Sequence, residues 1–450
     1  MSASKSSKAI PAAVAGLLLL TLVLRITVVV VDGHRLHSDP DAYVRLATML
    51  ANGQGYSTAD GSHATAFRPV LYPLLLAVPI KLGISASTAV TLWNLFSGVV
   101  LVLATIGLAQ ACGLGRKTCL LAGLLVAVDP LLIRYTTEPM TENVCAALFT
   151  LSLLFIVRFA SASNHGDTTN ALRMGLAAGL LLGVSALCRP VALVSCVLLT
   201  LVLLLVASGN PQPTATAPSS AWRRITWAFL PAVAAAVTVS PWIIRNAVEF
   251  RALVPATTHG GYTLLLGNNS EFYGRVVSGQ ERAWDGESLN RWQQGLEAQL
   301  TEIGINRADE RAVDQWMYKH AIAEIRSQPE MAVRAVLLRW KRFWAISPTA
   351  SDQSLPKYFV FAVGTWYVCI GIGLLASLMR LRRNTSIPLL WVSIVSFLIV
   401  HSFYWTNTRM RAPLTGILIV LAMIGWTVLT RQTADAGPAA LEATNEKHPD

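Results

Sequence analysis

The segment AIPAAVAGLLLLTLVLRITVVVV, residues 9–31, is followed directly by DGHRLHSDPD, residues 32–41. The apolar segment has one charged residue, Arg25, and it is long enough to cross a bilayer, which takes about 20 residues. The polar segment places Asp39 and Asp41 where the chain has just left the membrane, a position at which charge is costly. The run is too long for a signal peptide and has no small-residue cleavage site, so we expect an uncleaved first helix.

The composition extends this reading to the whole chain. Of the 450 residues, 53% are hydrophobic and 14% are charged, and the mean hydropathy is +0.50. Soluble proteins carry about 25% charged residues. The sequence therefore predicts an all-α polytopic membrane protein.

Ten apolar runs are candidates for transmembrane helices, at about 9–31, 86–111, 118–133, 142–159, 173–188, 191–208, 225–243, 357–379, 386–404 and 412–430. With the N-terminus in the cytoplasm, every short cytoplasmic connection is basic, as the positive-inside rule requires. These connections hold Arg116–Lys117, Arg158 to Arg173, Arg223–Arg224, Arg380 to Arg383 and Arg431. We therefore predict a multi-pass protein of the cytoplasmic (inner) membrane with both termini in the cytoplasm.

The apolar segment RPVLYPLLLAVPIKLG, residues 68–83, tests this count. It is too short to span, and counting it would place the basic loops outside. We expect it to lie along the outer interface. The first extracytoplasmic loop then covers about 32–85.

The predicted domains follow from these spans: a membrane domain 1–243, an extracytoplasmic domain 244–356, transmembrane helices 357–432 and a disordered cytoplasmic tail 433–450. The extracytoplasmic domain contains 13 basic and 13 acidic residues, so no nucleic-acid partner is implied. Within it, helices are expected over 308–329 and 329–348, and a loop over 260–269. Residues 209–220, GNPQPTATAPSS, are expected to be a flexible linker.

Charged side chains gather at the outer ends of the predicted helices. Each one alone is more often a solvated loop residue or a lipid-headgroup contact. Together, carboxylates beside several arginines suit group transfer from a lipid phosphate, in which guanidinium groups hold the phosphate and a carboxylate takes or orients a proton. The set comprises Asp39, Asp41, Arg68, Arg134, Glu138, Glu142, Arg189, Arg245, His401, Arg409 and Arg411.

Several motifs resemble type C glycosyltransferases, the family that includes the protein O-mannosyltransferases and the bacterial lipid A aminoarabinose transferase. The motifs occur in the expected order and cover most of the chain: SDPDAYVRLATMLANGQGY (38–56), TAFRPVLYPLLLA (65–77), DPLLIRYTTEPMTENVCAAL (129–148), SPWIIRNAVEFRALVPATTHGGYTLLLGNN (240–269) and HSFYWTNTRMRAP (401–413).

The resemblance implies roles for individual residues. Asp39, four residues before Tyr43, matches the family's proposed base, and Glu142 matches an acidic residue that opens the fourth helix. The implied donor-phosphate ligands are Arg68, His401, Arg409 and Arg411, with Asp41, Tyr43 and Arg245 in supporting positions. This sequence departs from some relatives at two positions. Pro40 separates Asp39 from Asp41, and Arg68 stands where some relatives have lysine.

The resemblance implies a glycosyltransferase that moves a sugar from a polyprenyl-phosphate donor to a lipid, glycan or protein acceptor on the extracytoplasmic face. We expect inversion by single displacement, because one convincing base can be named. No cofactor or metal-ligand set is expected, although a divalent metal is left open. The alternatives are a lipid-linked polysaccharide ligase or polymerase and a transporter, and a transporter would place charges deeper within its helices.

Overall fold

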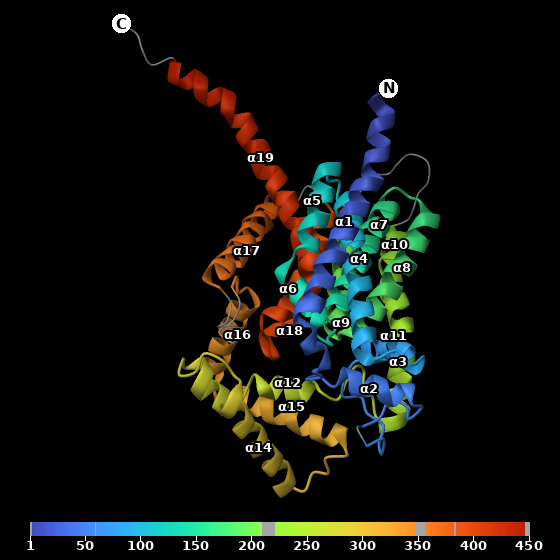
Figure 1. Ribbon diagram of the computed structural model, residues 1–450, viewed down its shortest axis with the longest axis vertical. Helices are drawn as coiled ribbons and strands as arrows, with labels where there is room; N and C mark the ends of the chain where they lie inside the picture. The colour runs from blue at the N-terminus through green and yellow to red at the C-terminus, as the bar shows by residue number, and fades with distance from the viewer. Residues whose placement is uncertain (1, 59, 209–220, 348–355, 382–383, 446–450) are drawn as a thin grey trace.

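A computed structural model describes residues 2–58, 60–208, 221–347, 356–381 and 384–445. Long apolar helices stand side by side in a bundle (Figure 1), which confirms the predicted all-α polytopic class. The helices of the bundle are α1 (Ser2–Asp32), α4 (Ala86–Ala111), α5 (Arg116–Ala127), α6 (Pro130–Arg134), α7 (Glu142–Asn164), α8 (Thr168–Cys188), α9 (Val191–Ser208), α10 (Ala221–Ala228), α11 (Leu230–Phe250), α17 (Lys357–Ser377), α18 (Ser386–Phe403) and α19 (Thr415–Asn445).

Among the described residues, eight helices are long and apolar enough to cross a bilayer: α1, α4, α7, α8, α11, α17, α18, and α19 together with the preceding turn η6 (Thr408–Leu414). Two of the ten predicted spans, 118–133 and 191–208, do not form a single long helix of this kind. The run 118–133 is divided into α5 and α6 with a bend of 42°, because Pro130 begins a new helix and the Asp129 carboxylate accepts the Leu132 N–H at 3.0 Å. The run 191–208 forms the shorter apolar helix α9.

The outer surface of the bundle is apolar, whereas Arg25, the one charged residue of the apolar run 9–31, faces inward. Leu205, Val237 and Phe361 are each more than 60% exposed, and large exposed apolar side chains over a whole bundle suit a lipid environment. Arg25 is 1% exposed. It donates to Thr136 Oγ1 at 2.7 Å, and to the Leu132 oxygen in α6 and Asn143 Oδ1 in α7, both at 3.1 Å. Arg25 therefore holds the bent pair and the start of α7 against α1.

Short helices cover one end of the bundle, called here the loop end. They are α2 (Tyr43–Ala51), α3 (Leu71–Lys81), α12 (Gly260–Leu266), α13 (Ser270–Phe272), the π-helical turn η3 (Tyr273–Val277), α14 (Gly286–Glu302), α15 (Glu310–Ser327) and α16 (Pro329–Phe343). With 11 residues, α3 is about 16 Å long and cannot cross a core of about 30 Å, as predicted. Helices α15 and α16 lie within the predicted ranges, and Pro329 begins α16.

The prediction of a loop over 260–269 was wrong, because α12 occupies most of it. Two adjacent glycines are poor helix formers, but here they allow contact with α15. A Cβ at Gly261 would lie 2.2 Å from the backbone oxygen of Asp314, and the Gly261 N–H donates to the Asp314 carboxylate at 2.7 Å. Tertiary packing therefore outweighs the local preference.

The start of α1 and the end of α19 lie at the same end of the bundle, opposite to α2, α12, α14 and α15 (Figure 1). Helix α19 continues to Asn445 through part of the tail that was expected to be disordered, and this stretch contains five residues of the strong helix former alanine. Residues 446–450 and the predicted linker 209–220 lie outside the described residues.

The orientation of the bundle remains a prediction, and cysteine labelling would test it. A cysteine at the exposed position Ala298, in α14, should react with an impermeant maleimide in intact cells, whereas one at the exposed Thr169, in α8, should react only after permeabilisation. The parent protein gives the background from its native thiols. The reverse pattern would show that the loop end faces the cytoplasm.

Candidate active site

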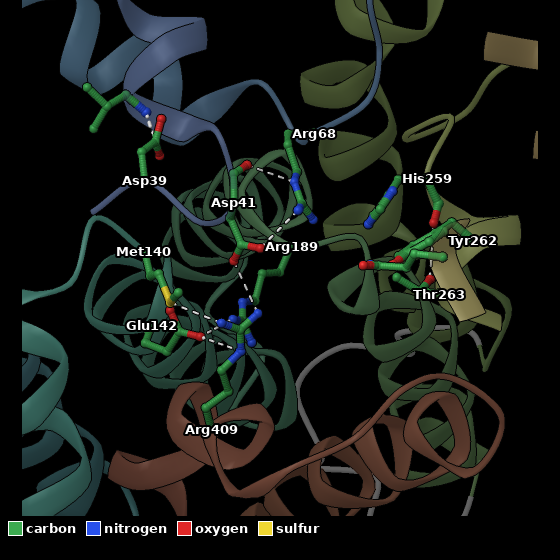
Figure 2. Close-up of polar contacts among 12 residues, drawn as sticks. Asp39, Asp41, Arg68, Met140, Glu142, Arg189, His259, Tyr262, Thr263 and Arg409 are labelled. Atoms are coloured by element: carbon green, nitrogen blue, oxygen red, sulfur yellow. Dashed lines mark hydrogen bonds and ion pairs between the residues drawn. The ribbon is translucent and has the colours of Figure 1, made fainter. Parts of the chain in front are cut away.

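The carboxylate of Asp41 joins two arginines at the loop end. Its Oδ1 lies 2.9 Å from Arg68 Nη2, and its Oδ2 lies 3.2 Å from Arg409 Nη2 (Figure 2). Arg68 Nε also donates to the backbone oxygen of Asp41 at 2.9 Å. The three side chains are between 16% and 21% exposed. Residues from opposite ends of the chain thus meet at one half-buried point.

A second carboxylate, that of Glu142, extends this group. Its Oε1 lies 2.5 Å from Arg189 Nη2 and 3.5 Å from Arg409 Nε, so Arg409 contacts both acids. The Glu142 side chain is 1% exposed and its Oε2 has no hydrogen-bond partner among the described residues. These five residues, Asp41, Arg68, Glu142, Arg189 and Arg409, are called the charged cluster.

Helix ends explain why the sequence brings these side chains together. Glu142 begins α7, where a carboxylate suits the positive end of the helix dipole, and Arg189 directly follows α8. Arg189 Nε also donates to Thr141 Oγ1 at 2.8 Å. Arg409 lies in η6, just before α19. Because these apolar helices end together at the loop end of the bundle, the polar residues at their termini lie close to one another.

The cluster has positive charge and N–H groups to spare, because three guanidinium groups face two carboxylates. Two of the N–H groups contact sulfur, which is a weak acceptor: Arg409 Nη1 lies 3.0 Å from Met140 Sδ, and Arg189 Nη1 lies 3.8 Å from Met410 Sδ. An anion placed among the arginines would offer these donors a stronger partner.

The arginines also set the protonation state of Asp41. Burial alone would raise the pKa of its carboxyl, but Arg409 and Arg68 outweigh burial, and the pKa lies below its usual value. Burial raises the pKa of the Tyr43 phenol well above its usual range. Tyr43 packs edge-on against Tyr72 at 5.3 Å, beneath Arg68. The site thus holds an ionised Asp41 beside a neutral phenol.

The predicted base, Asp39, lies outside the charged cluster. Its two oxygens accept the backbone N–H groups of Val44 at 3.2 Å and Arg45 at 2.9 Å, in the first turn of α2 (Figure 2). Ala42, with a left-handed φ of 61°, closes the turn between Asp39 and α2. The carboxylate that joins the arginines is therefore Asp41, which was expected only in a supporting position.

Two predicted phosphate ligands have other partners. Arg411 donates to the backbone oxygens of Phe343 at 3.3 Å and Ala345 at 2.8 Å, and its guanidinium lies over the Tyr367 ring at 4.1 Å. His401 lies between the rings of Phe343 and Phe397 at 6.0 and 6.2 Å. The contacts of both residues stabilise the end of α16 and the turn before η6 instead of joining the cluster.

Arg245 likewise supports the first loop. It donates to the backbone oxygens of Tyr56 at 2.9 Å and Thr65 at 2.8 Å, and lies over the Trp242 ring at 5.2 Å. Its contacts hold the loop against α11.

Glu310 is a residue that the sequence did not single out. This first residue of α15 accepts three hydrogen bonds, from Thr65 Oγ1 at 2.5 Å, the Ala66 N–H at 3.0 Å and Thr258 Oγ1 at 2.6 Å. It therefore fastens the segment just before Arg68 to α15. In the sequence it is one of many acids at a helix start, and its long-range partners leave no local signal.

A small apolar hollow adjoins the cluster. Its lining includes Pro69 and Pro190, which directly follow Arg68 and Arg189, together with Leu187, Val239 and Trp242. Among the described residues, no group of three or more His, Cys, Asp and Glu side chains is arranged to hold a metal ion.

Comparison with known proteins gives a likeness in fold. No family profile and no curated protein matches the sequence. Oligosaccharyltransferase AglB from Archaeoglobus fulgidus, solved with an inhibitory peptide and a dolichol-phosphate, matches with a TM-score of 0.54 and 12% identity over 97% of this chain and 52% of AglB. ArnT from Cupriavidus metallidurans, bound to undecaprenyl phosphate, matches with a TM-score of 0.42 and 16% identity. This match covers 99% of this chain and 82% of ArnT.

The chain spans about half the length of AglB, and at this identity the match shows a shared fold. AglB is a type C glycosyltransferase, so the fold agrees with the resemblance found in the sequence motifs.

The two possible roles of Asp39 lead to different expected results. If its carboxylate only caps α2, Asp39→Ala should destabilise the protein by about 1 kcal/mol, whereas Asp39→Asn, which keeps an acceptor oxygen, should restore stability and leave sugar transfer unchanged. Thermal unfolding in detergent and transfer by membranes measure the two effects. Glu302→Ala, at the exposed end of α14, is the control. A loss of transfer of about a hundredfold in a stable Asp39→Asn variant would instead identify a base.

Proposed function

We propose that this protein is a glycosyltransferase that moves a sugar from a polyprenyl-phosphate donor to an acceptor at the loop end. We further propose that the loop end is the extracytoplasmic face of the cytoplasmic membrane. The observation that carries the proposal is the charged cluster, with three guanidinium groups, two carboxylates and unused N–H donors at the mouth of an apolar bundle.

The charge of the cluster suits a phosphodiester. A sugar–phosphate–polyprenyl diester carries one negative charge, which would balance the one excess positive charge. Guanidinium groups bind phosphate oxygens through pairs of parallel hydrogen bonds. Arg189 Nη1 and Arg409 Nη1 would exchange sulfur contacts for phosphate oxygens.

The surroundings of the arginines suit the lipid part of the donor. The lining of the small apolar hollow includes Pro69 and Pro190, which directly follow Arg68 and Arg189. A lipid phosphate held by these arginines would therefore have apolar side chains immediately beside it. AglB, which has the same fold, was solved with a dolichol-phosphate, and this supports a lipid-phosphate ligand here.

The reaction that follows is a displacement at the anomeric carbon. The bond from this carbon to the phosphate oxygen breaks as an acceptor atom bonds to its opposite face, so the configuration is inverted. The arginines stabilise the charge of the departing phosphate. Asp41 and Glu142 hold the guanidinium groups in position, and we propose that this positive charge makes a cofactor unnecessary.

Binding of a polyprenyl phosphate, the lipid part of the donor, tests this function. Arg68→Lys, Arg189→Lys and Arg409→Lys should each weaken binding of decaprenyl phosphate in detergent by about tenfold, or about 1.4 kcal/mol, because lysine lacks the planar fork. Pairs of substitutions should cost less than the product of the single losses, because the three groups share one phosphate.

Arg334→Lys is the matched control, since Arg334 is 59% exposed and pairs with Glu330 on α16. If the three cluster variants bind decaprenyl phosphate as the parent and the control do, the arginines serve the fold alone and the proposed function is wrong.

A further inference from the structure

The imidazole of His259 is held in a fixed orientation beside the charged cluster. His259 directly precedes α12. Its ring lies 4.3 Å from that of Phe67 and is stacked on Tyr262 at 4.9 Å with an interplanar angle of 24°. Figure 2 shows the ring beside Arg68, on the side away from Asp41.

The backbone around His259 is also fixed. Its carbonyl accepts hydrogen bonds from the Thr263 N–H and hydroxyl, both at 3.2 Å. The preceding residue, Thr258, is bound by Glu310 and donates its N–H to the Ala66 oxygen at 2.9 Å. Glu310 thus fixes both the segment before Arg68 and the segment before His259.

His259 is half-buried, and its nitrogens form no hydrogen bond or ion pair within the part of the chain that the structure describes. Burial, together with Arg68, lowers the pKa of the imidazole to about 3. The ring is therefore neutral at physiological pH. One nitrogen has a free lone pair that can accept a hydrogen bond, and a neutral ring cannot act as a cation for phosphate.

The carboxylates of the cluster are poorly placed to accept a proton from an incoming acceptor. Both oxygens of Asp41 are paired with guanidinium groups. One oxygen of Glu142 is paired with Arg189, and the unpaired Oε2 belongs to a side chain that is 1% exposed, so an incoming acceptor cannot reach it. A free acceptor beside Arg68, on the other side from Asp41, is supplied by His259.

We propose that His259 is a catalytic residue on the acceptor side, where it accepts the hydrogen bond and then the proton of an acceptor hydroxyl. This inference rests on the proposed function and deepens it, because it names the acceptor as an alcohol, on a sugar or on a serine or threonine. The acceptor oxygen bonds to the anomeric carbon as the carbon–phosphate-oxygen bond breaks. The electron pair of that bond leaves with polyprenyl phosphate, and the hydroxyl proton moves to the imidazole and then to water.

The charges around His259 allow this proton transfer when donor is bound. The titratable groups that surround it are Arg68 and Asp41 from the first loop, Tyr262 from α12, and Glu310, Asp314 and Tyr318 from α15. In the free protein Arg68 opposes an imidazolium. A phosphate bound to Arg68 adds a negative charge that favours the imidazolium, so donor binding prepares the base.

The test separates phosphate binding from hydroxyl activation. His259→Phe keeps an aromatic ring between Phe67 and Tyr262 but removes the lone pair, and His259→Gln is a second variant in case phenylalanine disturbs folding. Both should bind decaprenyl phosphate within twofold of the parent, and His259→Phe should lose transfer by about a hundredfold. Transfer is followed in membranes of the producing cells, which contain native acceptors and labelled polyprenyl-phosphate sugars. In the parent, protonation of His259 should lower the rate of transfer at acid pH. In His259→Gln, this loss at acid pH should disappear.

His320→Gln is the matched control, because His320 is also stacked on an aromatic ring, that of Trp316 at 4.8 Å, but is 43% exposed and lies elsewhere on α15. Transfer by His259→Phe at the parent rate would overturn the proposal. So would a loss of decaprenyl phosphate binding equal to that of Arg68→Ala, because His259 would then act on the phosphate. If Arg68→Ala itself binds normally, the proposed function fails instead.

Discussion

Charge pairing at the edge of an apolar bundle is the constraint on which the arrangement of this site depends. A charge taken out of water costs several kcal/mol unless partners surround it. Arg68, Arg189 and Arg409 meet this requirement by sharing the carboxylates of Asp41 and Glu142. Because five charges must meet within hydrogen-bonding distance, the ends of α7 and α8, the turn η6 and the first loop are all held in one place. The structure of the loop end follows from this requirement as much as from apolar packing.

The partners of the arginines distinguish two kinds of role. Arg245, Arg339 and Arg411 donate to backbone oxygens, and each joins segments that are distant in sequence. Backbone oxygens are fixed acceptors, so such an arginine joins its two segments without any ligand, although Arg339 Nε and Arg411 Nη2 have no partner among the described residues. The arginines of the charged cluster have carboxylates and sulfur atoms as partners and retain unused donors. The first kind of arginine stabilises the fold, and the second kind is available to bind an anion.

This distinction also shows how far the sequence could predict the site. Hydropathy located most of the spans, since lipid contact requires long apolar runs, and it placed the charged residues at helix ends. It could not tell Asp39 from Asp41, because a left-handed residue at position 42 decides which carboxylate turns back to α2. It also could not separate Arg411 from Arg189, since their partners lie far away in the chain. Local patterns predict helices, whereas the roles of charged residues depend on tertiary contacts.

The charge of the cluster bears on the kind of donor. A polyprenyl-phosphate sugar has one negative charge and would make the charged cluster neutral. A polyprenyl-diphosphate sugar, the donor expected of a polysaccharide ligase or polymerase, carries two and would leave a net negative charge in a half-buried site. That charge would lie beside Asp41 and Glu142, where repulsion is stronger than in water because the dielectric constant is lower. A further cation would then be required. The five residues on their own balance one negative charge, which is why we propose a phosphodiester donor and not a diphosphate.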